Sequence, residues 1–178
     1  MVLSIDAVDP RNLKNDAKYT YHFLSKEELF AFSKHKEYEL TEDFIKETLG
    51  KGDECFGILE NDILASYGWY SNRQTPVSNE LSLHFMKDYI YMYKGFTHHQ
   101  YRGLRLHAIG MSKALEAYTH RAFKGIVSYV ESDNFRSFKS VYRTGYKYFG
   151  NIYILKIFGK YLIFSGNGCK KYGFWVES

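Results

Sequence analysis

The spacing of hydrophobic residues along the chain changes between the period of strands and the period of helices. Apolar runs at 54–60 and 63–70 flank Asn61-Asp62, a pair typical of a tight β-hairpin. Gly95 lies inside another strand-like segment, where a glycine often marks a bulge or a close approach of another group. Alternating or aromatic-rich segments predict the remaining strands, at 18–24, 80–85, 88–97, 123–130, 146–158, 160–164 and 172–176.

Four helices are expected between these strands. Ser25-x-x-Glu28 is a capping box that predicts a helix to about residue 36, and Thr41 caps a second helix. Apolar residues at steps of three and four predict a long helix over 102–121, and a shorter one is expected over 134–144. This order predicts a single α/β domain over residues 1–178, with a mixed, mostly antiparallel central sheet flanked by helices.

Composition narrows the class of protein. The 178 residues suffice for one domain with a core, and 19% aromatic residues with only 2 Pro favour strands over disorder. The net charge of +4 comes from scattered Lys and Arg, not from a basic stripe, which argues against a nucleic-acid partner. Two cysteines do not form a disulfide framework. No segment resembles a signal peptide or a membrane span, so we expect a cytoplasmic protein without a membrane partner.

Candidate chemistry gathers in two motifs in the second half of the chain. The first, Thr97-His98-His99-Gln100-Tyr101-Arg102-Gly103-Leu104-Arg105-Leu106-His107-Ala108, joins a predicted strand to a predicted helix. A helix N-terminus offers free N–H groups and partial positive charge, both of which suit a diphosphate. The second motif is Asn134-Phe135-Arg136-Ser137, with Gly145-Tyr146 at the end of the same segment.

In order and spacing, the two motifs resemble those of the Gcn5-related N-acetyltransferases (GNAT family). The resemblance covers about residues 54–158 and implies the fold of that family, with acetyl-CoA as the acyl donor and an acetyl-CoA-dependent N-acetyltransferase activity. In the family, the first motif binds pyrophosphate and the second contacts the pantetheine arm and the thiol. The cofactor-binding residues that the resemblance implies are Phe96, Thr97, His98, Arg102, Gly103, Leu104, Arg105, Leu106, His107, Asn134 and Ser137.

The first motif departs from the family's Gln/Arg-x-x-Gly-x-Gly/Ala pattern at both glycines. Arg102 takes the first position, but Arg105 and His107 stand where glycines are usual. On one interpretation, the helical N–H groups still bind phosphate and the arginines add charge. On the other, the larger side chains block the phosphate and the site has decayed.

The resemblance also implies where catalytic groups lie. In the family, a main-chain N–H of the bulged strand before the loop binds the thioester oxygen, and residues 95–98 occupy the matching place. A tyrosine often lies seven residues after the asparagine; here that position is Val141, and Tyr142 is turned from it by about 100°. Tyr93 lies where members often carry Glu or His, and its unperturbed pKa of about 10 makes it a poor base at neutral pH. Tyr93, which would align a water or the substrate, and Tyr142 are the candidate catalytic residues.

Other titratable residues near predicted strand ends are weaker candidates for a base, because surface or structural roles are commoner for them. These residues are Glu80, His84, His98 and Glu131. No metal site is expected, since the neighbours His98 and His99 face opposite ways in an extended segment and no acidic or cysteine partner has ligand spacing.

The sequence leaves more than one function open. The interpretation that we favour is direct transfer of acetyl to a primary amine of a small molecule, through a tetrahedral intermediate. A binding or regulatory protein with the same fold and weak or lost catalysis is the alternative, which Arg105, His107 and Val141 favour. A peptide- or protein-acetylating enzyme is a third interpretation, and a homodimer stays open.

Overall fold

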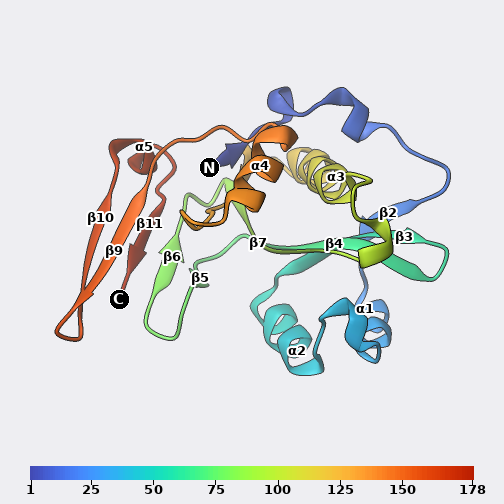
Figure 1. Cartoon of the computed structure of the whole chain (residues 1–178), viewed down its shortest axis with the longest axis horizontal. Coiled ribbons are helices and arrows are strands. Elements are labelled where there is room, and N and C mark those ends of the chain that lie inside the picture. The colour runs from blue at the N-terminus through green and yellow to red at the C-terminus, as the bar shows by residue number, and fades with distance from the viewer.

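The computed structural model describes all residues from Met1 to Ser178, and its centre is a six-stranded sheet with helices on both faces (Figure 1). The strands run in the order β1-β8-β7-β4-β3-β2, and only the β7–β8 pair is parallel. The mixed, mostly antiparallel sheet expected from the sequence is therefore confirmed. Its strands are β1 (Val2–Leu3), β2 (Thr20–Phe23), β3 (Glu54–Glu60), β4 (Ile63–Ser71), β7 (Tyr89–Thr97) and β8 (Gly125–Val127).

Different helices cover the two faces of this sheet (Figure 1). On one side lie α1 (Lys26–Ser33) and α2 (Glu42–Lys51), which begin at the predicted caps Ser25 and Thr41. On the other side α3 (Leu106–His120) packs on the sheet, with α4 (Phe135–Thr144) beside it. Residues of β4 alternate between the two layers, so that Tyr67 and Trp69 pack with α1 and α2, whereas Tyr70 packs with α3.

Several predicted boundaries are wrong; the strand predicted over 146–158, for example, begins only at Ile152. Two others lie at the turn into α3 and at the end of β8. The long helix begins at Leu106, not at residue 102, because a 3₁₀ turn over His99–Tyr101 precedes it and the intervening backbone is not helical. Gly103 there has a φ of 85°. Strand β8 ends at Val127, three residues before the predicted end, because its pairing with β7 stops there.

The strands after residue 150, with β5 (Thr75–Pro76) and β6 (Ser82–His84), form a separate layer at one end of the molecule (Figure 1). An antiparallel hairpin of β9 (Ile152–Ile157) and β10 (Lys160–Ser165) does not join the central sheet. After α5 (Asn167–Lys170), strand β11 (Trp175–Glu177) pairs with β6, which in turn pairs with β5. Cys55 and Cys169 are both buried and free. None of the helices has the length and apolar character that a bilayer span requires.

Candidate functional site

The site begins where β7 separates from β8. The two strands pair only from Tyr89 to Tyr91, after which β7 continues along β4 and the chain beyond β8 turns away. The β7 backbone groups on the open side therefore have no strand partner. Trp69 pairs with Lys94 and Tyr70 with Met92, so Tyr93 is an extra, bulged residue in β7. An opening of this kind can bind an extended ligand through main-chain hydrogen bonds.

A cavity of about 840 Å³ fills this opening. Residues of β7, the N-terminal half of α3, the segment after β8 and α4 line it. Asn134 caps α4 as predicted, because its side chain accepts a hydrogen bond of 3.1 Å from the N–H of Ser137. The predicted site residues that line this cavity are Tyr93, Phe96, Thr97, Arg102, His107, Asn134 and Ser137.

A second cavity of about 370 Å³ adjoins the first at the N-terminus of α3. Its lining contains no carboxylate and five cationic side chains, which are Arg102, Arg105, Arg136, Lys139 and Arg143. The free N–H groups of α3 and this excess of positive charge suit a ligand with several phosphates. Sequence reasoning missed the three residues of α4, although their steps of three and four place them on one helix face.

Two of the residues proposed for the cofactor line neither cavity. The N–H of His98 donates to the carbonyl of Ala65 beyond the end of β7, and the His98 ring is buried against Tyr38 and Tyr101. Leu104 lies in the turn before α3 with 51% of its surface exposed. In contrast, Gly103, Arg105 and Leu106 line the second cavity, as expected from the motif.

Arg105 and His107, which replace the usual glycines, have well-defined places. Arg105 has a φ of 63°, so it adopts the left-handed conformation that favours glycine, and its guanidinium lies 3.7 Å from the carboxylate of Asp9. The His107 ring packs on Gly95, where a Cβ atom would come within 2.2 Å of His107 Cε1. Burial lowers the pKa of His107 to about 4, so the ring is neutral at pH 7. His107 lines both cavities and therefore forms part of the boundary between them.

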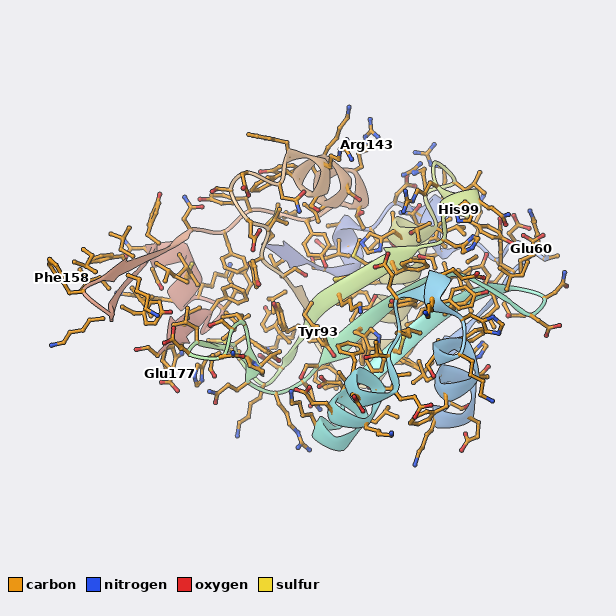
Figure 2. The ribbon with its side chains drawn as sticks, turned by 60° about the horizontal axis from the view of Figure 1, so that its bottom comes forward. Glu60, Tyr93, His99, Arg143, Phe158 and Glu177 are labelled. Atoms are coloured by element: carbon orange, nitrogen blue, oxygen red, sulfur yellow. The ribbon has the colours of Figure 1, made fainter.

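Tyr93 and Asp53 form a polar pair at the bulge. The Tyr93 hydroxyl donates a hydrogen bond of 3.0 Å to Oδ2 of Asp53, a residue that directly precedes β3 and is only 5% exposed. The other carboxylate oxygen, Oδ1, has no hydrogen-bond partner. Burial and then the Asp53 charge raise the pKa of Tyr93, so its hydroxyl stays protonated. Figure 2 shows Tyr93 near the middle of the molecule, away from Arg143, which lines the second cavity.

The other acid and base candidates lie outside the cavity, with one exception. Val141 lines the cavity, whereas Tyr142 does not; it is 55% exposed and stacks on Phe138, as its rotation by about 100° implies. Glu131 is the exception, with an exposed carboxylate in the cavity lining. At the C-terminal layer, Glu80 pairs with Lys156 and His84 stacks on Trp175.

No family model and no curated protein sequence matches the chain. Solved structures do match. AAC(6')-Iy in complex with the bisubstrate analogue CoA-S-monomethyl-acetylneamine has a TM-score of 0.61 and 13% identity over 78% of this chain and 97% of its own. A ribosomal-protein-alanine N-acetyltransferase from Brucella melitensis has a TM-score of 0.56 and 12% identity, over 78% and 99% of the two chains.

A putative acetyl transferase from Pyrococcus furiosus has a TM-score of 0.53 and 22% identity, with 78% of this chain and 99% of that chain covered. At sequence identities of 12–22%, the similarity between this chain and these structures concerns the fold alone. The turn into α3 lies where the first sequence motif predicted it. The bulge lies at Tyr93 and not at residues 95–98, which the resemblance implied, because Gly95, Phe96 and Thr97 keep a regular register with β4. The chain thus has the fold of the Gcn5-related N-acetyltransferases.

Proposed function

We propose that this protein is an acetyl-CoA-dependent N-acetyltransferase that acetylates a primary amine of a small molecule. The observation that carries the proposal is the pair of adjoining cavities, one strongly basic at the start of α3 and one beside the bulge of β7. The matched acetyltransferases support it, among them the one whose bound analogue joins CoA to acetylneamine.

The two cavities suit the two ends of acetyl-CoA. The N–H groups at the start of α3, with Arg102 and Arg105, would bind the diphosphate, and the basic face of α4 would bind the remaining phosphate. The pantetheine arm would lie along the unpaired edge of β7. Bound in this way, acetyl-CoA supplies an activated thioester, and a β7 N–H beside the bulge would donate to its oxygen as negative charge develops.

The Tyr93–Asp53 pair supplies a path for the proton that the amine must lose. With its own proton donated to Asp53, the Tyr93 oxygen is free to accept a hydrogen bond from the attacking amine. As the nitrogen bonds to the acetyl carbon, Tyr93 would take the amine proton and release its own to the Asp53 carboxylate. The C–S bond of the thioester would then break, and CoA would leave as its thiolate, which solvent protonates. The base proposed here is therefore Asp53, acting through Tyr93, whose raised pKa makes it unsuited to act as a tyrosinate.

A second candidate function is a binding protein of the same fold without efficient transfer. The observation that favours it is the place of His107, whose ring packs on Gly95 between the two cavities. In this case the chain would bind a phosphate-bearing ligand in the basic cavity without bringing a thioester to the bulge.

Calorimetric titration with acetyl-CoA tests the proposed cofactor. We expect a micromolar Kd that weakens at least about tenfold in Arg102→Ala, since a charge-assisted hydrogen bond contributes about 1.5–3 kcal/mol. Arg73→Ala is the matched control, because Arg73 is exposed, lines neither of the two cavities and forms no ion pair. A wild-type protein that gives no heat and no thermal shift with acetyl-CoA would refute the proposal.

Release of the CoA thiol in the presence of a panel of primary amines tests the transfer. Tyr93→Phe and Asp53→Asn should both lower kcat, and Asp53→Asn should also change how kcat depends on pH. The Kd for acetyl-CoA should stay the same in both variants. Binding of acetyl-CoA without thiol release for any amine would favour the second candidate.

A further inference from the structure

The β9–β10 hairpin presents an apolar face that no other part of the chain covers. In an antiparallel pair, residues directly opposite each other share a face. Tyr153 lies opposite Phe164, and Leu155 opposite Leu162. These four side chains are 59%, 56%, 52% and 45% exposed, and Ile157 on the same face is 47% exposed.

The opposite face of the hairpin is anchored to the molecule. Tyr161 and Ile163 pack on the hydrophobic cluster that contains Leu83 and Val176. Lys156 forms an ion pair of 2.5 Å with Glu80, to which the Tyr161 hydroxyl also donates. The hairpin is thus held in one orientation, and its outer face stays a fixed apolar surface.

At the turn, this surface extends to Phe158, whose side chain is fully exposed. Figure 2 shows Phe158 at the outer end of the hairpin, remote from Tyr93 and from Arg143. A partner that covers the outer face would therefore leave both cavities open. A two-stranded hairpin is only marginally stable in water by itself, so burial of this face would also stabilise the layer.

We propose that the outer face of the β9–β10 hairpin binds the same face of a second copy of this chain. With about 200 Å² for a large aromatic side chain, the exposed parts of these residues amount to roughly 600 Å² per copy. That area matches the lower range of specific interfaces, about 600 Å² per partner. A monomeric protein would instead leave this contiguous apolar patch in water.

The chemistry of the face fits a copy of itself. Its centre is uncharged, and Lys160, its only charged residue, lies at the end beside the turn. Two such faces related by a two-fold axis would bring aromatic and aliphatic side chains together without burying a charge. Because the same residues are used on both sides, the contact closes as a dimer and does not extend into a polymer.

Sedimentation velocity over 1–100 μM tests the proposal, with the double variant Leu155→Glu/Leu162→Glu. We expect a wild-type dimer, and we expect its association to weaken by about 100-fold or more in the double variant, because four carboxylates would meet in an apolar contact. Ile63→Glu is the matched control, since Ile63 is also an exposed apolar residue of a hairpin (39%) and should leave the dimer intact.

Circular dichroism must show that the double variant keeps its secondary structure; otherwise Phe158→Ser/Leu162→Ser replaces it in the same comparison. A wild-type monomer at 100 μM would overturn the proposal. So would a dimer that persists in the folded variant, or a ladder of larger oligomers in place of a closed dimer.

Discussion

At the scale of single residues, Arg105 combines a strained backbone with a useful charge. Its φ of 63° lies in the left-handed region, which costs a residue with a Cβ atom about 1 kcal/mol or more. Glycine takes this conformation without that cost, which is the physical reason for the usual glycine in this turn. In this chain, the arginine adds a guanidinium to the basic cavity at the same position.

Paired substitutions at Arg105 separate strain from charge. Arg105→Gly and Arg105→Ala both remove the guanidinium and its contact with Asp9, but only the glycine relieves the backbone. We expect the glycine variant to have the higher free energy of unfolding, by about 1 kcal/mol, in urea denaturation. An alanine variant as stable as the glycine variant would show that the turn changes its conformation when the arginine is removed.

At the scale of elements, α4 contributes its basic face to the second cavity. We expect Lys139→Gln to weaken acetyl-CoA binding about fivefold, a loss on the order of 1 kcal/mol for one partly exposed ionic contact. Lys147→Gln is the matched control, because Lys147 follows α4, is exposed and lines neither of the two cavities. Calorimetry at low and high salt checks the cause, since screening should reduce the effect of Lys139→Gln. Equal affinities of the two variants would place the ligand phosphates away from α4.

Elements that short-range interactions specify could be predicted from the sequence. The capping box at Ser25, the β3–β4 hairpin and the cap of α4 by Asn134 each depend on residues a few positions apart. The start of α3 could not be predicted, because its apolar spacing continues into a turn that Gly103 and Arg105 make non-helical. The end of β8 depends on tertiary pairing with β7, which no local pattern encodes.

The candidate site likewise has features that the sequence predicts and features that depend on the tertiary structure. The turn that we propose binds phosphate and the cap of α4 are sequence motifs, and most of their residues line the cavities. The Tyr93–Asp53 pair joins residues 40 positions apart, and the bulge that places Tyr93 results from its register with β4. Neither feature leaves a signal in the local sequence.

At the scale of the whole molecule, His107 links stability to pH. Its pKa is about 4 in the folded chain, against 6.5 for an ordinary histidine, because the half-buried ring packs on Gly95 and loses part of its hydration. Between these values the unfolded chain binds a proton that the folded chain does not, so the free energy of unfolding falls as the pH decreases from about 6.5 towards 4. Above pH 6.5 the ring is neutral in both states and this contribution vanishes.

Urea denaturation at pH 7 and pH 5 measures the effect of His107. Between pH 7 and pH 5, the free energy of unfolding of the wild type should fall by on the order of 2 kcal/mol more than that of His107→Gln. The reason is that pH 5 lies 1.5 pH units below the ordinary pKa of histidine, and each unit corresponds to about 1.4 kcal/mol. Carboxylates that titrate in the same range contribute equally to both proteins and cancel in the difference. His120→Gln should behave as the wild type, because His120 is exposed at the end of α3. If the free energy of unfolding fell equally in the wild type and in His107→Gln, the His107 ring would have to bind its proton in the folded chain as well. The passage between the two cavities would then be wider than the packing of His107 on Gly95 implies.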